Sequence, residues 1–249
     1  MSDEGGIRLQ AAVNGAWAAE RHPALPVTAA AIADAARSAR AAGADAIHLH
    51  VRNARGAESL AGDDVETVLT AVRNACPATP IGVSTGAWIV PDPAKRLRAI
   101  ADWQVLPDFA SVDFHEARAC EVADLLLSRG VGVEAGLWHL AAAELLLSSG
   151  LAARCLRVLI EPTQPDVEPA LAQAAGIEAT LDRARVARPR LLHGAGATAW
   201  PLLRAAAGRG FAVRVGLEDV LELPDGATAP DNAALVLAAR AILDDGVRG

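Results

Sequence analysis

The chain has 249 residues, 52% of them hydrophobic, so it can bury a large core as one barrel-type domain or as two smaller ones. Its 23 Lys and Arg against 30 Asp and Glu give a formal net charge of −7 without a basic cluster, which argues against a nucleic-acid surface. Three widely spaced cysteines form neither a disulfide framework nor a CxxC metal site. We therefore expect a cytoplasmic protein with no nucleic-acid partner.

No segment of the sequence carries a membrane signal. No apolar run reaches about 18 residues, so we expect no spanning helix and no membrane partner. The acidic start, Met1 to Glu4, lacks the basic and apolar regions of a signal peptide. The helical patterns are rich in alanine, and such an exterior would suit a homo-oligomer.

Apolar runs of strand length alternate with longer helical patterns along the whole chain. The expected strands cover residues 7–13, 44–52, 81–86, 109–114, 131–134, 156–160, 190–193 and 211–215. The expected helices cover residues 28–42, 63–76, a segment from about 92, 116–128, a segment from 135–136 through 147, 168–185, 198–207 and 232–243. No linker rich in Pro, Gly or Ser divides the sequence into two domains.

Eight strand–helix pairs in this length predict an α/β fold, a (β/α)8 TIM barrel formed as a single domain over residues 1–249. A doubly wound open sheet is the alternative. It would carry a Gly-rich phosphate turn after the first strand, and the segment Asn14-Gly15-Ala16 is not a GxGxxG motif. The barrel is therefore the favoured architecture.

The second expected strand carries two histidines with one residue between them. His48, His50 and Arg52 share one face of this strand, because side chains alternate along an extended chain. Imidazoles two residues apart lie roughly 6 to 7 Å apart at the backbone, so both can reach one divalent ion. The alternative is a histidine pair on an exposed edge or in a polar corner, with no metal.

Nearly every expected strand delivers polar residues at its C-terminal end. These residues are His48, His50, Ser84, Thr85, Ser111, Asp113, Glu134, Glu161, His193, Glu218 and Asp219. In a barrel those ends meet at one mouth, which carries the active site in this fold. Two histidines and one carboxylate are the donor set of a catalytic zinc site. From the pattern alone Glu218, Glu134 and Glu161 compete for the third position, and a salt bridge or a helix cap is the alternative for each.

Two further pairs of residues suggest catalytic and binding roles. If Glu218 faces the ion, Asp219 remains beside it as a base, and Arg214 can orient that carboxylate and keep it ionised. An ordinary partly buried ion pair is the alternative. Ser84 and Thr85 can donate hydrogen bonds to a carbonyl or carboxylate oxygen, or can cap the following helix.

Short motifs that occur in a known protein family follow one another, in the same order, along most of the chain. They are Asn14-Gly15-Ala16, His22-Pro23, Leu25 to Thr28, Ala42 to Arg52, Val83 to Gly86, Arg214 to Asp219 and Asn232 to Val236. Together they resemble the β-keto acid cleavage enzyme family, zinc-dependent (β/α)8 proteins formerly grouped as a domain of unknown function. His-x-His-x-Arg followed far downstream by Arg-x-Gly-x-Glu-Asp is the specific combination.

The resemblance implies zinc bound by His48, His50 and Glu218, a base formed by Asp219 with Arg214, and Ser84 on the substrate carboxylate or ketone. The implied reaction converts a β-keto acid and acetyl-CoA into acetoacetate and a new acyl-CoA by Claisen and retro-Claisen acyl transfer. Zinc on the substrate oxygens would stabilise the enolate after the base removes the C2 proton. We assign further polar residues at the strand ends to substrate binding, namely Thr85, Ser111, Asp113 and Glu134.

The chain departs from the family pattern at three positions. Trp17 stands where a glutamate is common, and Ser111-Val112-Asp113 replaces a Thr-x-Asn pattern. Only Glu134 remains of a Pro-Glu-x-Glu pattern. The metal and base motif is kept, whereas the residues that select the substrate side chain have changed. Trp17 and Trp138 are candidates for the floor of an altered pocket, with plain core packing as the alternative.

Two other functions remain open. A metal-dependent keto-acid aldolase, decarboxylase or hydrolase would use the same ion without CoA. Asp113 and Glu161 favour it, because acidic groups would repel an anionic substrate or serve as a second acid or base. Glu161 and His193 have no family counterpart that we can place. A barrel that binds a metal or metabolite without catalysis is the third function, since fold alone does not specify activity.

Overall fold

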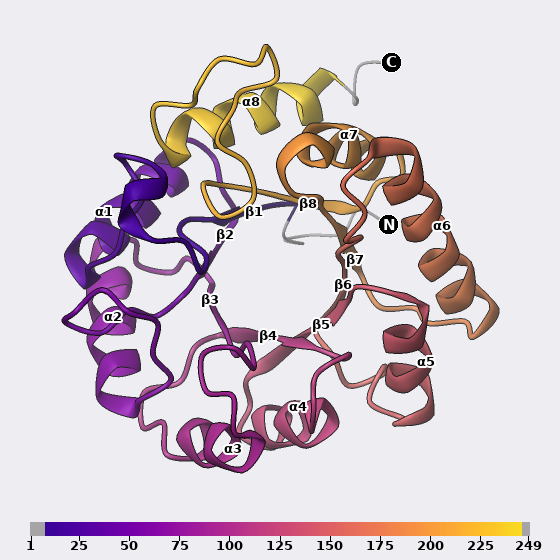
Figure 1. Ribbon diagram of the computed structural model, residues 1–249, viewed down its shortest axis with the longest axis horizontal. Coiled ribbons are helices and arrows are strands. Elements are labelled where there is room, and N and C mark those ends of the chain that lie inside the picture. The colour runs from indigo at the N-terminus through magenta and orange to yellow at the C-terminus, as the bar shows by residue number, and fades with distance from the viewer. Residues whose placement is uncertain (1–7, 246–249) are drawn as a thin grey trace.

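The computed structural model describes residues 8–245, in which eight parallel strands close into a barrel surrounded by helices (Figure 1). The strands are β1 Leu9–Ala12, β2 Ala46–Leu49, β3 Ile81–Ser84, β4 Phe109–Asp113, β5 Gly132–Leu137, β6 Arg157–Ile160, β7 Arg190–Leu192 and β8 Ala212–Val215. Each strand pairs with its neighbours in chain order, and β1 closes the barrel against β8. The predicted (β/α)8 fold is confirmed.

Each strand is followed by a helix that packs on the outside of the barrel. The α-helices are α1 Ala29–Ala41, α2 Gly62–Ala75, α3 Pro93–Ala101, α4 Ala119–Ser128, α5 Leu140–Ser148, α6 Val167–Arg183, α7 Ala199–Gly208 and α8 Asn232–Asp245. None of the helices within residues 8–245 combines the length and apolar character needed to cross a membrane. Ile7 and the acidic start, Met1 to Glu4, lie outside the described residues, and the domain limits 1–249 stay a prediction.

Helices α1 and α3 each begin at a side chain that caps the first turn. Thr28 Oγ1 accepts a hydrogen bond from the Ala31 amide at the start of α1. The Asp92 carboxylate accepts from the amides of Ala94 and Lys95 at the start of α3. Such caps pair amides that have no partner within the helix itself. The inward faces of these helices then pack against the outer face of the barrel.

The floor of the barrel, the part of its interior below the strand ends, is filled by hydrogen-bonded polar side chains and one aromatic ring. Glu134 Oε1 accepts a hydrogen bond from Gln10 Nε2 at 2.8 Å and pairs with Arg157 Nε at 2.7 Å. The Arg157 guanidinium lies 5.3 Å from the centroid of the Phe109 ring. A side chain on Gly82 would overlap this ring, so glycine is needed there. Buried charges are tolerated here because they are paired.

Strand β5 is longer than predicted. The sequence placed its end at Glu134 and the start of a helix at residues 135–136, but β5 continues to Leu137 and α5 begins at Leu140. Residues 135–137 pair with β4 or β6 and are buried, so the sheet overrides their helical composition. The prediction of Glu134 as a strand end is therefore wrong, because it lies in the middle of β5.

Candidate metal centre and active site

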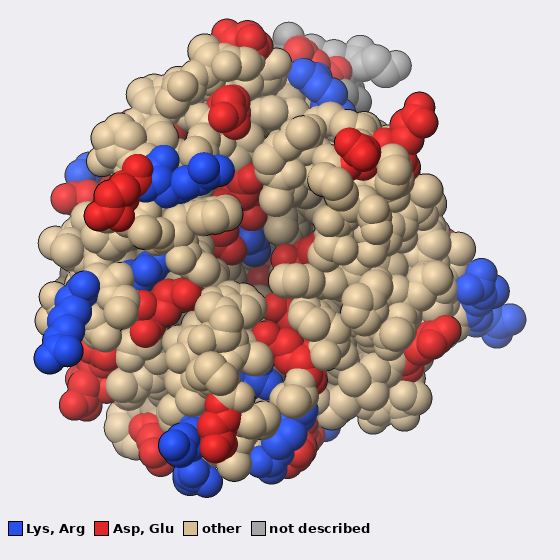
Figure 2. Space-filling view, in the orientation of Figure 1, with Lys and Arg blue, Asp and Glu red and all other residues tan. Residues whose placement is uncertain are grey.

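A cavity of about 590 Å³ opens at the C-terminal ends of the strands. The space-filling view is hollowed at its centre, with acidic and basic side chains inside the hollow (Figure 2). Predicted site residues that line the cavity are His48, His50, Ser84, Ser111, Asp113, Glu161, His193, Arg214, Glu218 and Asp219. Trp17, Trp88 and Trp138 contribute to the same wall. The predicted convergence at one mouth is therefore found.

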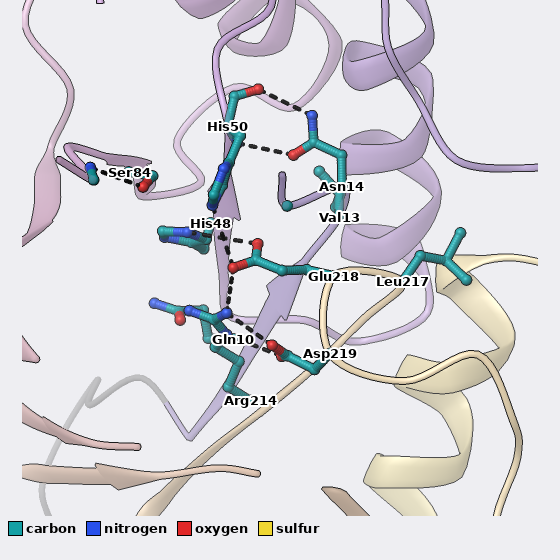
Figure 3. Close-up of polar contacts among 12 residues, drawn as sticks. Gln10, Val13, Asn14, His48, His50, Ser84, Arg214, Leu217, Glu218 and Asp219 are labelled. Atoms are coloured by element: carbon teal, nitrogen blue, oxygen red, sulfur yellow. Dashed lines mark hydrogen bonds and ion pairs between the residues drawn. The ribbon is translucent and has the colours of Figure 1, made fainter. Parts of the chain in front are cut away.

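Two histidines and one carboxylate come together on one side of this cavity (Figure 3). One ligand atom from each of His48, His50 and Glu218 lies within 4.8 Å of the others. Nε2 of His48 is 3.6 Å from Glu218 Oε2, and Nε2 of His50 is 3.3 Å from Glu218 Oε1. Oε2 of Glu218 is buried without a hydrogen-bond partner. Burial holds the pKa of His48 well below its ordinary value. This donor set fits a divalent ion.

Two glycines bring Glu218 to the histidines. Gly15 has a φ of +61°, and a Cβ at this position would lie 2.5 Å from Cγ of Glu218. A Cβ on Gly216 would overlap the backbone of Ala12 in β1. Trp17 Nε1 donates to the carbonyl oxygen of Glu218 at 2.8 Å. Close backbone approach thus explains why glycine occupies both motifs.

Two buried asparagines hold the backbone of the site. Asn14 Oδ1 accepts from the His50 amide at 2.8 Å, and its Nδ2 donates to the His50 carbonyl at 2.9 Å. Asn232 Oδ1 accepts from the Leu217 amide at 2.9 Å, and its Nδ2 donates to the Val13 carbonyl at 2.9 Å. The segments around His50 and Leu217 are therefore tied directly to the end of β1 and to the start of α8.

Glu58 and Trp88 support His50, and sequence reasoning missed both. Glu58 Oε1 lies 2.5 Å from His50 Nδ1, and Trp88 Nε1 donates to Glu58 Oε2 at 3.0 Å. Burial lowers the pKa of His50, but the carboxylates of Glu218 and Glu58 outweigh burial and raise it to about 9. The available signal was Gly56, where the chain turns back so that Glu58 bridges to Arg52.

Asp219 is held beside the metal ligands by two hydrogen bonds from one guanidinium. Arg214 Nε lies 3.0 Å from Asp219 Oδ2, and Arg214 Nη2 lies 2.8 Å from Oδ1. The same Nη2 contacts Glu218 Oε1. Burial raises the pKa of Glu218, but Arg214, His50 and His48 overcome it and hold that pKa well below its ordinary value. Asp219, the predicted base, and its partner Arg214 thus lie next to the triad.

Three further ionisable groups, His193, Glu161 and Asp113, line the same cavity. His193 Nε2 lies 3.0 Å from Glu161 Oε2, and His193 Nδ1 lies 3.6 Å from Asp219 Oδ1. Burial, assisted by Arg214, lowers the pKa of His193 to about 4, so the ring is neutral at neutral pH. Burial raises the pKa of Glu161 to about 7. Burial and then the neighbouring Glu161 carboxylate raise the pKa of Asp113 well above its ordinary value.

The residues predicted to bind substrate divide into two groups. Ser84, Ser111 and Asp113 line the cavity. Thr85 does not line it, because its Oγ1 donates to the Ser111 carbonyl at 2.7 Å. Glu134 lies below the cavity in the floor network already described. Thr85 and Glu134 therefore support the barrel, whereas the other three can contact a ligand.

The fold and the site define a (β/α)8 barrel protein with a candidate metal centre at the C-terminal mouth. A family model described as beta-keto acid cleavage enzyme matches residues 7–248. The chain therefore belongs to the beta-keto acid cleavage enzyme family, as its motifs predicted.

Three proteins illustrate the similarity. The 3-keto-5-aminohexanoate cleavage enzymes of Acetoanaerobium sticklandii and Fusobacterium nucleatum are 34% and 35% identical over 106 residues. That alignment covers 42% of this chain and 38% of each relative, well under two thirds of their length. The apo structure of ObcA superimposes with a TM-score of 0.72 at 19% identity, over 90% of this chain and 62% of that chain. This structural likeness shows the fold alone.

Proposed function

We propose that the protein is a zinc-dependent β-keto acid:acetyl-CoA C-acyltransferase that forms acetoacetate and a new acyl-CoA. The observation that carries the proposal is the triad of His48, His50 and Glu218 with Asp219 held beside it by Arg214. Membership of the beta-keto acid cleavage enzyme family supports the same chemistry. Zinc is the metal proposed, because two imidazoles and one carboxylate are a donor set typical of catalytic zinc.

A bound zinc ion would supply a Lewis acid that polarises the keto-acid oxygens. Asp219 accepts the proton from C2 of the substrate, and Arg214 fixes the orientation of the receiving carboxylate. C2 then bonds to the acetyl carbon of acetyl-CoA as the carbon–sulfur bond breaks. The released thiolate adds to the original ketone carbon, the bond from that carbon to C2 breaks, and Asp219 returns its proton to the acetoacetate formed.

Other side chains in the cavity bind and shield the substrate. Ser84 and Ser111 line the wall and can donate hydrogen bonds to its oxygens. Trp17, Trp88 and Trp138 surround the same space. Apolar walls limit the access of water, which would otherwise hydrolyse the thioester.

A CoA-independent keto-acid aldolase, decarboxylase or hydrolase is the second candidate. Asp113 and Glu161 favour it, because both carboxyls face the cavity and have raised pKa values. A carboxyl group with such a pKa can act as an acid near neutral pH.

One experiment separates these functions. The protein loaded with zinc is incubated with a panel of β-keto acids, with and without acetyl-CoA, and acetoacetate and acyl-CoA are quantified by mass spectrometry. We expect both products in equal amounts, only when acetyl-CoA is present, and none from His48→Ala. Turnover without any thioester would reject the acyltransferase in favour of the second candidate. Zinc bound at less than about 0.2 per chain would reject the metal site itself.

A further inference from the structure

Three neighbouring strands deliver three ionisable side chains to the cavity side by side. Glu161 follows β6, His193 follows β7, and Asp219 follows β8. All three side chains line the cavity. Because β7 pairs with both β6 and β8, His193 stands between the two carboxylates. The chemistry proposed above uses Asp219 as a base but gives no role to His193 or Glu161.

Backbone hydrogen bonds hold these three residues in their places. The His193 amide donates to the carbonyl oxygen of Ile160, the residue before Glu161, at 3.2 Å. The Gly196 amide, in the loop after β7, donates to the carbonyl oxygen of Asp219 at 2.7 Å. The segment that carries His193 is therefore fixed to the residues on both sides of it. A histidine held in this way keeps each ring nitrogen on one partner.

The two ring nitrogens of His193 face different carboxylates. Burial lowers the pKa of His193 to about 4, so the ring is neutral and carries one proton. Nε2 lies 3.0 Å from Glu161 Oε2, and a carboxylate can only accept, so the proton is on Nε2. Nδ1 lies 3.6 Å from Asp219 Oδ1 and is buried without a hydrogen-bond partner within residues 8–245. Its lone pair can accept a proton from Asp219 once that carboxylate has gained one.

The two carboxylates differ in their access to water. The Asp219 side chain is 5% exposed and accepts two hydrogen bonds from Arg214, whereas the Glu161 side chain is 16% exposed. Burial raises the pKa of Glu161 to about 7, although Arg214 and the adjacent Trp138 ring oppose this rise. A carboxyl group with such a pKa can take up and release a proton near neutral pH. Glu161 is thus the end of the row at which a proton can be stored or exchanged with water.

We propose that His193 is a further catalytic residue, which carries the proton from Asp219 to Glu161 while the substrate carbanion reacts. This inference rests on the proposed function, in which Asp219 removes the C2 proton. The C2–H bond breaks and its electron pair stays on the enolate. The proton on Asp219 then passes to Nδ1 of His193 as the Nε2 proton passes to Oε2 of Glu161, so the ring stays neutral.

This transfer keeps the enolate available for the acetyl group. A proton that remained on Asp219 could return to C2 before the new carbon–carbon bond forms. On Glu161 it is separated from C2 by the His193 ring. The reverse transfer brings a proton back to Asp219, which gives it to the acetoacetate formed.

The test measures hydrogen exchange at C2 of acetoacetate, which the proposed reaction forms whatever the side chain of the other substrate. The zinc-loaded protein is placed in D2O with acetoacetate and without acetyl-CoA, and NMR follows the C2 protons. We expect the wild-type protein to exchange them faster than the same solution without protein. The proton that leaves C2 reaches Glu161, where water replaces it with a deuteron.

Two variants of similar side-chain size interrupt the transfer. In His193→Gln the amide can still donate to Glu161 but cannot take up and release a proton, and Glu161→Gln removes the final acceptor. Each should slow the exchange by at least about tenfold, because a positioned proton-transfer group contributes at least that much. Glu222→Gln, at the exposed edge of the same cavity, should exchange at the wild-type rate.

Further measurements distinguish proton transfer from a structural role. Zinc content and the Kd for acetoacetate, measured by elemental analysis and calorimetry, should be unchanged in both variants, and in acyl transfer kcat should fall while KM stays the same. Thermal unfolding checks that the variants fold, and if His193→Gln does not fold, Glu161→Gln decides by the same criteria. Wild-type exchange in the variant that folds would overturn the role of His193, as would a loss that follows lower zinc content or weaker acetoacetate binding.

The two proposals fail separately in this experiment. Exchange that depends on His193, without acyl transfer from acetyl-CoA, would retain the proton transfer and reject the acyltransferase. Acyl transfer with exchange that is independent of His193 would do the opposite. No exchange by the wild-type protein would reject Asp219 as the base, and both proposals with it.

Discussion

The two sides of the cavity are built in different ways. On the side of β2 and β8, the candidate metal ligands are held by other side chains: Asn14 and Glu58 fix His50, and Arg214 contacts Glu218. On the side of β4 and β6, Glu161 pairs with His193, and within residues 8–245 no hydrogen bond or ion pair holds the Asp113 carboxylate. The first side is therefore preorganised for an ion, whereas the second keeps carboxyls whose pKa values are raised by burial.

The largest expected effects distinguish the residue that binds the metal from the residue that acts as the base. Glu218→Gln should lose both metal and turnover, because it removes the only carboxylate of the triad. Asp219→Asn should keep the metal but lower kcat by roughly 10²- to 10⁴-fold, the usual contribution of a positioned base. Zinc content by elemental analysis and kcat for acetoacetate formation measure the two effects. If both variants lose zinc equally, Asp219 belongs to the metal site.

The next effect tests how rigidly the metal side is held. Glu58→Gln weakens the contact to His50 Nδ1, so we expect metal affinity to fall by about 10- to 100-fold, as is typical for a carboxylate behind a histidine ligand. Competition with a chelator of known affinity measures it without reference to turnover. Glu222→Gln, at the exposed edge of the same cavity, is the matched control. Unchanged affinity in Glu58→Gln would show that Asn14 and the backbone suffice to orient His50.

A smaller effect concerns the stability of the opposite side. Carboxyls whose pKa is raised by folding destabilise the protein as pH rises from the unfolded value toward the folded one. The pKa of Asp113 is raised well above its ordinary value and that of Glu161 to about 7, so for Glu161 that window extends from about pH 4 to about pH 7. Asp113→Asn should therefore raise the free energy of unfolding by about 1 to 2 kcal/mol at pH 8 and by little near pH 4. Denaturant unfolding at both pH values checks this, and a pH-independent gain would contradict the repulsion.

The smallest effects compare two neighbouring hydroxyls. Ser84 lines the cavity, so Ser84→Ala should lower kcat/KM by about tenfold through loss of one hydrogen bond to substrate. Thr85→Val removes the bond to the Ser111 carbonyl and should cost about 1 kcal/mol of stability with kcat/KM nearly unchanged. Kinetics and denaturant unfolding on both variants measure the difference. A reversed pattern would place Thr85 rather than Ser84 on the substrate.

Local patterns predicted the barrel and most of the mouth. Alternation placed His48 and His50 on one face, and the order of the strands brought Glu218 beside them. The alternation of side chains does not show how far a residue lies from the end of its strand. Glu134 was therefore assigned to the mouth, although β5 continues to Leu137. A glycine in a strand pattern predicts that the strand ends there, whereas Gly136 lies within β5 and makes room for side chains from two neighbouring strands.

Side-chain contacts between loops could not be predicted from the sequence. Glu58 reaches His50 only because the chain turns back at Gly56, and Trp88 meets Glu58 from the loop after β3. Neither position is marked by periodicity, since both lie outside the regular elements. The competition among Glu218, Glu134 and Glu161 for the triad likewise depended on three-dimensional register, which places Glu134 in the floor and Glu161 across from β2.

Strand β1 lies between β2, which contains His48 and leads to His50, and β8, which leads to Glu218. An ion bound by His48, His50 and Glu218 would thus connect β2 to β8 at the place where the first and last strands of the barrel pair. The complete three-residue site exists only once β2 and β8 are both placed beside β1, so full metal affinity should appear late in folding. Metal loading would then protect β1, β2 and β8 from local opening as well as prepare the protein for chemistry.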